Sequence, residues 1–169
     1  MSRLLSWDFD VTDRVTMRIR QAKLGDLETL AELFDLYRQF YEYPQDIGLA
    51  KRYLAERIGN QESVIYLAQD DDGMALGFVQ LYPSFSSTLA GKVWILYDLF
   101  VRKEGRRQGV ARALMNRAAH LARETGAVEI NLATATNNTQ AQALYESLGY
   151  KRDDEFYVYA LNPARANPE

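Results

Sequence analysis

Hydrophobic and polar positions recur with a clear period along most of the chain, and that period changes between strand-like and helical. Residues 17–22 (MRIRQA) alternate in polarity as a half-buried strand does. Residues 27–37 carry hydrophobic side chains at helical spacing after Asp26, a residue type that caps helices. The pattern breaks at Pro44, and residues 47–58 repeat it. One strand followed by two helices is therefore predicted.

The middle of the chain predicts three strands. Residues 63–68 and 75–82 flank an Asp-Gly turn (DDDG, residues 70–73), so we expect a hairpin there. Residues 83–91 (PSFSSTLAG) are rich in turn-forming types and predict a loop. Residues 92–101 (KVWILYDLFV) are hydrophobic almost throughout, which is typical of a central strand covered on both faces.

The last part of the chain alternates helices with strands. A helix is expected to begin at Gly109, a strand to follow at residues 128–134, and a short helix to run from an Asn138 cap to a stop at Gly149. Residues 155–161 (EFYVYAL) predict a last strand. The order β-α-α-β-β-β-α-β-α-β indicates a mixed α/β fold with helices on the faces of one sheet.

The patterned region covers residues 17–161, and we predict a single domain there because the length suits one sizeable core. Residues 1–16 are predicted to be an N-terminal extension and residues 162–169 a C-terminal tail. No hydrophobic run approaches a membrane span, and the N-terminus lacks the core of a signal peptide. A soluble, cytoplasmic protein without a membrane partner is expected.

The composition excludes several kinds of binding and catalytic site. The net charge of -3 argues against general nucleic-acid binding, which needs a basic surface. There is no cysteine, which excludes disulfides, thiolate nucleophiles and thiolate metal sites. The lone histidine, His120, excludes a histidine metal cluster and weighs against a Ser-His-Asp triad, and we assign it no role. No metal is predicted.

An arginine-rich turn stands out in this acidic chain, at residues 104–114 (EGRRQGVARAL). A buried strand, a tight turn and a helix that begins at Gly109 together form an anion site, because the helix N-terminus exposes backbone N–H groups. Gly109 and Ala111 leave room for a phosphate or pyrophosphate. The chain lacks GxxxxGK[ST], the P-loop pattern of nucleoside-triphosphate sites, and GxGxxG, the fingerprint of dinucleotide sites. The alternative is a solvated basic turn that only caps a helix.

Three motifs give a resemblance to a family. The pattern R-x-x-G-x-A at Arg106, Gly109 and Ala111 resembles the acyl-CoA pyrophosphate signature of the GNAT N-acetyltransferases. The run N-x-x-A-x-x-L-Y-x-x-x-G-Y at residues 138–150 resembles the second signature of that superfamily, and residues 96–101 (LYDLFV) resemble the strand before the turn. The order of the elements fits as well.

This resemblance implies a GNAT fold, in which a central mixed, mostly antiparallel sheet is splayed between two central strands and helices lie on both faces. It also implies acetyl-CoA as the donor. The pantetheine arm is expected in the splay, the pyrophosphate at the arginine turn, and Asn138 and Ala141 beside the arm. The implied cofactor-binding residues are Leu99, Phe100, Val101, Arg106, Arg107, Gln108, Gly109, Val110, Ala111, Arg112, Asn138 and Ala141.

The implied reaction is direct attack of an amine on the thioester. Tyr145 is the expected general acid, since a phenol can protonate the departing thiolate; its alternative role is to pack its ring under the sheet. Asp98 is the first candidate for the general base, because a charged residue inside so hydrophobic a strand needs a reason. A structural aspartate is the alternative, and Glu42 and Asp46 are weaker candidates for the base.

The acceptor is expected to be a primary amine, either a small polyamine-like amine or a lysine-type side chain. Tyrosines in YRQFYEYP and nearby carboxylates suit a cation. Segments of the chain are similar to diamine and to histone or polyamine acetyltransferases, although the diamine enzymes carry Glu-Asp where this chain has Tyr97-Asp98. The superfamily implies a homodimer. Competing hypotheses are a non-catalytic acyl-CoA sensor and a phosphate-binding regulator.

Overall fold

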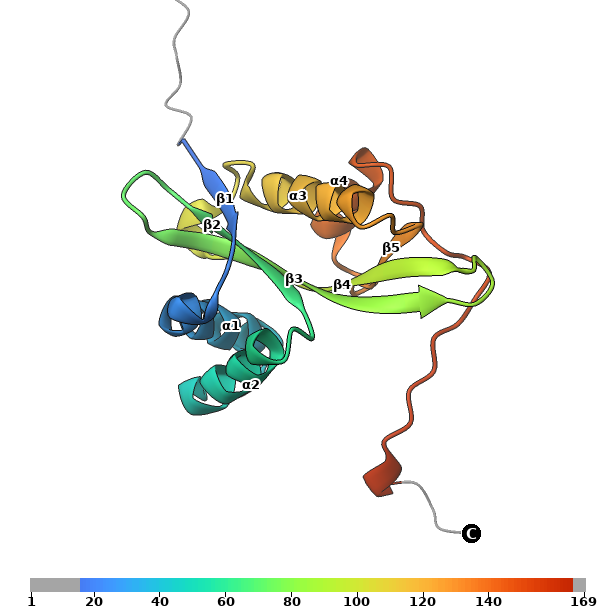
Figure 1. The fold of residues 1–169 in the computed structure, drawn as a ribbon, viewed down its shortest axis with the longest axis horizontal. Coiled ribbons are helices and arrows are strands. Elements are labelled where there is room, and N and C mark those ends of the chain that lie inside the picture. The colour runs from blue at the N-terminus through green and yellow to red at the C-terminus, as the bar shows by residue number, and fades with distance from the viewer. Residues whose placement is uncertain (1–15, 166–169) are drawn as a thin grey trace, which may run out of the picture. The chain divides into compact units, whose positions relative to one another are not determined.

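The computed structural model describes residues 16–165 (Figure 1). The described residues cluster into two compact units, one ending at Ala133 and one starting at Thr134. Residues 1–15, most of the predicted extension, and residues 166–169 of the predicted tail lie outside the described residues. The division into one domain with two tails therefore stays a prediction.

The first unit is built on a sheet in which five described strands follow chain order. Neighbouring strands run antiparallel from β1 to β4, whereas β4 and β5 are parallel. The mixed, mostly antiparallel sheet expected from the sequence is thereby confirmed. The strands are β1 (Arg18–Gln21), β2 (Val64–Gln69), β3 (Ala75–Ser86), β4 (Gly91–Val101) and β5 (Glu129–Leu132).

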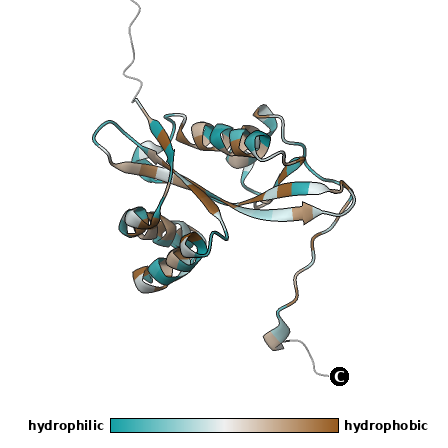
Figure 2. Cartoon of the chain, in the orientation of Figure 1, coloured by the Kyte–Doolittle hydropathy of each residue, from teal (hydrophilic) through white to brown (hydrophobic). Residues whose placement is uncertain are grey.

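Helices cover both faces of this sheet, as predicted. Helices α1 (Leu27–Phe40) and α2 (Ile47–Gly59) lie together on one face, and α3 (Val110–Glu124) lies on the other (Figure 1). Hydrophobic residues are dense along the central strands, whereas α3 carries both hydrophobic and hydrophilic residues (Figure 2). The helical spacing puts the hydrophobic side chains on the inward face. On α1 the buried hydrophobic residues are Leu30, Ala31, Leu33 and Phe34.

The start of α1 differs from the prediction in one detail. Asp26 stands at the N-cap position, but its carboxylate makes no capping hydrogen bond to the helix. It accepts hydrogen bonds from the Lys23 backbone N–H at 2.8 Å and from the Arg20 guanidinium at 2.6 and 2.8 Å. The bond from Arg20 is the main reason that the pKa of Asp26 lies below its usual range. Asp26 therefore joins α1 to β1, because a charged partner is the stronger donor.

Strand β3 is longer than predicted. It continues through Pro83 to Ser86, and residues 87–90 alone form the turn to β4, so the predicted loop at residues 83–91 is wrong. Proline lacks a backbone N–H and is tolerated in a strand where no neighbour needs that donor. Pairing of β3 with β2 stops at Leu81, so one side of Pro83 has no neighbour among the described strands.

The sheet opens between β4 and β5. The two strands pair only over Val93–Leu96 and Glu129–Leu132, while β4 continues to Val101. Among the described strands, β4 therefore has no neighbour on its β5 side from Tyr97 onward. This is the splay that the resemblance implied, and it leaves backbone groups of β4 available to a ligand.

The second unit contains α4 (Thr139–Ser147), whose two ends match the prediction. The Asn138 side chain accepts the Ala141 backbone N–H at 3.2 Å, which caps the helix. Gly149 ends it with φ of 89°, and the residue after it donates its backbone N–H to the Tyr145 carbonyl at 3.1 Å. This left-handed end is the reason for a glycine at this position.

The predicted last strand at residues 155–161 is wrong for the described chain. This segment has no strand structure, and its large hydrophobic side chains are 76–96% exposed. A strand needs a neighbour for its backbone N–H and C=O groups, and an alternating sequence does not supply that neighbour. Before it, Asp153 accepts the backbone N–H groups of Glu155 and Phe156 at 2.9 and 3.1 Å, which forms a local turn.

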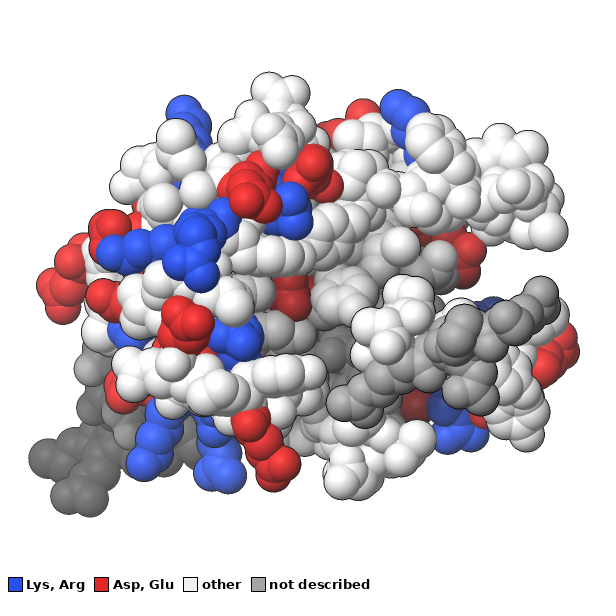
Figure 3. All heavy atoms as spheres, turned by 90° about the horizontal axis from the view of Figure 1, so that it is seen from below, with Lys and Arg blue, Asp and Glu red and all other residues white. Residues whose placement is uncertain are grey.

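On the face seen in Figure 3, basic and acidic side chains lie among one another, and neither sign forms a patch of its own. Within residues 16–165, no helix is both long and hydrophobic enough to cross a membrane. In the same range, no three histidine, aspartate or glutamate side chains gather as metal ligands do.

Candidate active site

Strand β4 contains a β-bulge beside the splay. Gln80 of β3 lies opposite Asp98, but Leu81 lies opposite Leu96, so Tyr97 is an extra residue in β4. A bulge bends its strand and re-aims the neighbouring side chains. Tyr97 is 69% exposed, whereas Asp98 is 4% exposed. The bulge therefore puts a phenol at the surface next to a buried carboxylate.

Asp98 has polar neighbours on two elements. Gln80 Nε2 of β3 donates to Asp98 Oδ2 at 2.6 Å, and the Tyr37 phenol of α1 also favours the charged form of this carboxylate. Ser63 Oγ donates to Gln80 Oε1 at 2.8 Å and fixes the amide from its other end. Burial raises the pKa of Asp98, and the interactions with Gln80 and Tyr37 offset only part of that rise. The carboxylate is consequently a stronger proton acceptor than an exposed aspartate.

Tyrosine side chains from α1, α2, β3 and β4 lie near this carboxylate. The hydroxyls of Tyr53 and Tyr82 lie 2.5 Å apart, and the Tyr82 ring meets the Tyr97 ring edge-on at 5.8 Å. Burial raises the pKa of both Tyr37 and Tyr82 far above the usual value, and the charge of Asp98 adds to that rise. These phenols therefore stay neutral and present hydroxyl groups and ring faces, which suit a cation.

The arginine turn joins the end of β4 to α3 and is held by hydrogen bonds to β3 and β4. Arg102 N–H donates to the Leu76 carbonyl at 2.9 Å, and Arg106 Nε donates to the Val101 carbonyl at 3.2 Å. Gly109 has φ of 80°, and α3 begins at the next residue. A side chain added at Gly109 would meet no atom within 4 Å, so the approach to the helix N-terminus is open. An anion can reach the first N–H groups of α3 from this side.

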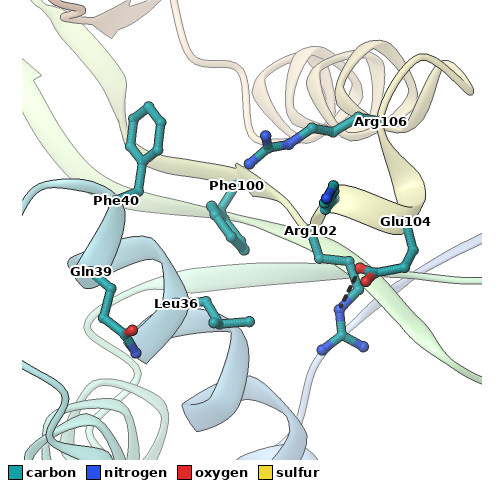
Figure 4. A pocket seen from close by; sticks show the side chains of 8 residues that line it. Leu36, Gln39, Phe40, Phe100, Arg102, Glu104 and Arg106 are labelled. Atoms are coloured by element: carbon teal, nitrogen blue, oxygen red, sulfur yellow. Dashed lines mark ion pairs between the residues drawn. The ribbon is translucent and has the colours of Figure 1, made fainter.

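A pocket of about 410 Å³ adjoins this turn (Figure 4). Phe40 of α1 and Phe100 of β4 give it hydrophobic surface. Its charge is mostly positive, because one acidic residue, Glu104, lies 3.8 Å from Arg102 among three basic ones. The lining residues are Leu36, Gln39, Phe40, Phe100, Arg102, Lys103, Glu104 and Arg106. A pocket of this kind suits a ligand that is both anionic and partly hydrophobic.

Comparison with known proteins decides the family. Residues 30–150 match the family model described as "Acetyltransferase (GNAT) family". The chain belongs to the GNAT acetyltransferase family. It is an enzyme of that family, whose members transfer an acetyl group from acetyl-CoA to an amine. The splay, the bulge and the arginine turn are thus features of an acetyltransferase.

Three similar proteins support this assignment. The "Uncharacterized N-acetyltransferase YhfO" of Bacillus subtilis is 42% identical over 88% of this chain and 100% of that protein. The "Thialysine N-epsilon-acetyltransferase" of Caenorhabditis elegans is 30% identical over 62% of this chain and 64% of that protein. A crystal structure of a probable acetyltransferase has a TM-score of 0.81 and 46% identity, covering 86% of this chain and 97% of that one.

The predicted site residues of this acetyltransferase fall into two groups. Asp98, the end of β4 and the arginine turn belong to the first unit, where the structure brings them together along one stretch of chain. Asn138, Ala141 and Tyr145 belong to the second unit, where they share one side of α4 at helical spacing. Tyr145 is half-buried, with its ring 6.1 Å from that of Tyr150. The catalytic and cofactor roles of both groups stay predictions.

Three other titratable residues have structural surroundings of their own. Asp46 caps α2 by accepting the Leu49 backbone N–H at 2.8 Å. Glu42 is exposed at the end of α1 and has a positive φ of 65°. His120 lies on α3, with Nε2 3.2 Å from the Glu124 carboxylate. Asp98 interacts with Gln80 and Tyr37 rather than with any of these three residues, and it remains the buried carboxylate at the bulge.

Sequence reasoning missed the contribution of α1 and β3. Gln80 donates a hydrogen bond to Asp98 and Tyr37 interacts with it, yet in the sequence each looks like an ordinary strand or helix residue. The signal that could have revealed Gln80 is a lone amide within the hydrophobic run ALGFVQLY. Leu36 and Phe40, four residues apart on α1, are 38% and 59% exposed because they line the pocket.

Proposed function

We propose that this acetyltransferase moves the acetyl group of acetyl-CoA to a primary amine by direct attack on the thioester, with Asp98 as general base and Tyr145 as general acid. The single observation that carries the proposal is a buried carboxylate of raised pKa at a bulge beside the open edge of β4. The carboxylate is oriented by the amide of Gln80 and lies next to Tyr97, which is at the surface.

A base is needed because the acceptor arrives charged. An alkyl ammonium has a pKa of about 10.4, so roughly one molecule in a few thousand is neutral at pH 7. Recovering the neutral amine is worth about 4–5 kcal/mol of barrier. Asp98 suits this step, since burial makes its carboxylate more basic than an exposed aspartate.

The residues around the splay fit acetyl-CoA, which supplies the activated acetyl group when bound. We assign the backbone of Leu99, Phe100 and Val101 to the pantetheine arm, since β4 has no described neighbour there. The turn from Arg106 to Arg112 would hold the pyrophosphate, supported by the open approach at Gly109. On α4, Asn138 and Ala141 would lie beside the arm, and Tyr145 would protonate the departing thiolate.

The acceptor in this proposal is a small polyamine-like amine or a lysine-type side chain. Exposed Tyr97 with Tyr82 behind it offers ring surface to an ammonium group, and Asp98 offers the charge. The name of the Caenorhabditis elegans relative, a thialysine Nε-acetyltransferase, describes a lysine-like amine. Because Tyr97 stands where the diamine enzymes carry a second carboxylate, one ammonium group has a charged partner at the bulge.

The experiment is release of the CoA thiol from acetyl-CoA, read with a disulfide dye, against spermidine, putrescine, lysine peptides, amino acids and aminoglycosides. The chain has no cysteine and therefore adds no thiol signal. We expect turnover with one amine class and a loss of about 10²–10⁴-fold in kcat for Asp98→Asn. Turnover that survives this substitution would remove Asp98 as the base.

Tyr145→Phe tests the general acid in the same assay. It keeps the ring and removes the hydroxyl, so we expect a lower kcat with an unchanged KM for acetyl-CoA. Full activity of this variant at neutral pH would contradict the role. If CoA binds but no amine in the panel is acetylated, the non-catalytic acyl-CoA sensor becomes the better account.

We also propose that the enzyme is a homodimer. The support is the exposed hydrophobic segment of the second unit, since large exposed hydrophobic patches mark interaction surfaces. Its exposed residues are Phe156, Tyr157, Val158, Tyr159 and Leu161. Light scattering coupled to size exclusion should give twice the chain mass of 19.4 kDa. A mass of one chain at all concentrations would rule the dimer out.

A further inference from the structure

The pocket beside the arginine turn contains a half-buried guanidinium, that of Arg102. Its side chain is 22% exposed, and its Nε has no hydrogen-bond partner among the described residues. The Glu104 carboxylate is its ion-pair partner, but it lies 3.8 Å from Nε, which is too far for a hydrogen bond. Burying a charged group without hydrogen bonds costs free energy. Arg102 therefore suits a ligand that brings an acceptor for its N–H groups.

We propose that this pocket binds a carboxylate group of the acceptor, so that the substrate is an amino acid with an amine in its side chain. The inference rests on the proposed function and narrows its substrate class. A guanidinium binds a carboxylate through two parallel hydrogen bonds, because the spacing of its N–H groups matches that of the two oxygens. The pocket, of about 410 Å³, has room for the carboxylate end of such a molecule.

The charges that line the pocket favour an anion. Arg102, Lys103 and Arg106 are positive and Glu104 is negative. Arg106 Nε already donates to the Val101 carbonyl at 3.2 Å, and it holds the end of β4 in this way. Arg102 is therefore the guanidinium of the pocket that is best placed to bind a ligand.

The hydrophobic walls of the pocket suit the carbon chain of an amino acid. Leu36 and Phe40 of α1 are 38% and 59% exposed, and Phe100 of β4 lines the same pocket (Figure 4). Methylene groups gain free energy when they leave water for such surfaces. A phosphate group alone would gain nothing from them, whereas an amino acid uses both the walls and the charge.

The pocket lies on the same face of β4 as Asp98. Side chains alternate along a strand, so Asp98, Phe100 and Arg102 share a face. This is the face that α1 covers, because the Phe100 ring lies 6.3 Å from the Tyr37 ring of α1. The backbone is still extended at Arg102, so four residues separate it from Asp98 by about 13 Å. Both side chains reach into that interval, and a chain of several methylene groups fills the rest.

A phosphate of the cofactor is the other anion that Arg102 could bind. The open N–H groups at the start of α3 are the phosphate site of the proposed function, and α3 covers the face of the sheet opposite to α1 (Figure 1). The pocket is instead lined by the last turn of α1 and by Phe100. This placement favours an anion on the acceptor, and the experiment separates the two sources.

The test compares lysine with lysinamide, and ornithine with ornithinamide, in the thiol-release assay. Each amide keeps both amines and lacks only the carboxylate. We expect wild-type kcat/KM to be about 10-fold or more higher for the amino acid of at least one pair, since a site that hydrogen-bonds a substrate group rejects the analogue without it. Arg102→Gln should lower that value about 10–100-fold, while kcat/KM for the amide and the Kd for CoA stay near wild type.

Arg123→Gln is the matched control. Arg123 is an exposed arginine in the last turn of α3, away from the lining of the pocket. Its substitution removes the same charge from the chain and should change neither kcat/KM nor the Kd for CoA. An unchanged Kd for CoA in Arg102→Gln also shows that this variant is folded.

Glu104→Gln provides a readout of the opposite sign. The Glu104 carboxylate repels an incoming carboxylate and pairs with Arg102, so its loss should raise kcat/KM for the amino acid about two- to fivefold. The value for the amide should stay within about twofold. If the ion pair only stabilised the turn, Arg102→Gln and Glu104→Gln would both lower activity, and they would do so for amino acid and amide alike.

Three outcomes would overturn the carboxylate site and leave acetyl transfer intact. One is an equal loss for amino acid and amide in Arg102→Gln. Another is a higher Kd for CoA in this variant with unchanged selectivity between the two, which would assign Arg102 to a cofactor phosphate. The third is wild-type activity that is no higher for either amino acid than for its amide. If wild-type protein acetylates no amine at all, the proposed function itself fails.

Discussion

Asp98 is expected to lower stability while it serves the reaction. Its folded-state pKa is raised, so between the unfolded value of about 3.9 and the folded value the folded state binds more protons. The free energy of unfolding therefore falls as pH rises through that interval, and a penalty is present at neutral pH. We predict that Asp98→Asn raises Tm at pH 7 while it removes activity.

Measuring the Tm of Asp98→Asn and of wild type at low pH provides the control. Below pH of about 3.5 both proteins are neutral at this position, so the difference in Tm should shrink toward zero. Thermal unfolding followed by circular dichroism across that range measures both limbs. A variant that is less stable than wild type by the same amount at every pH would show that Asp98 is a structural hydrogen-bond partner only.

The sequence predicted some residues of the candidate site from their type, but it did not predict their structural surroundings. Asp98 could be singled out because one charge interrupts the run KVWILYDLFV. The bulge at Tyr97 could not, because it depends on how β3 and β4 align, and the alternation of the sequence is the same with or without it. Tyr37 and Gln80 were missed for the same reason, since their contact with Asp98 joins three separate elements.

Among the elements, the approach of β3 to β4 gives the sharpest prediction. A Cβ added at Gly77 would lie 2.4 Å from the Phe100 carbonyl oxygen, a backbone atom that cannot rotate away. Gly77→Ala should therefore push the two strands apart just before the arginine turn. We expect a loss of about 1–3 kcal/mol in the free energy of unfolding, measured by denaturant titration, together with weaker CoA binding.

Gly59→Ala is the control, because an added side chain at Gly59 has free space around it. Gly59 ends α2, has an ordinary φ, and an added methyl group meets no atom within 4 Å. Alanine is the better helix former, so this change should be neutral or stabilising by up to about 1 kcal/mol. Equal effects at the two glycines would mean that close strand approach does not set the role of Gly77.

Hydrophobic periodicity was sufficient to predict some of the helices and strands but not all of them. The helices α1, α2 and α3 and the strands β2 and β4 were predicted within a few residues, because each has a buried face that fixes its period. The loop at residues 83–91 and the strand at residues 155–161 were wrong. Both depend on whether a neighbouring strand is present, which a local pattern does not encode.

At the scale of the whole molecule, binding of acetyl-CoA must appear as stability, because a ligand that binds only the folded state raises the free energy of unfolding. At 100 times its Kd, CoA should add about 2.7 kcal/mol, or about 5–10 °C in Tm for a chain of this length. ATP and NAD at equal concentration should add much less, because neither carries the pantetheine arm that we assign to the open edge of β4. The shift should shrink as salt rises from about 0.05 to 0.5 M, since exposed arginines are screened. A shift by ATP as large as that by CoA would leave the arginine turn as a general phosphate site and support the phosphate-binding regulator instead.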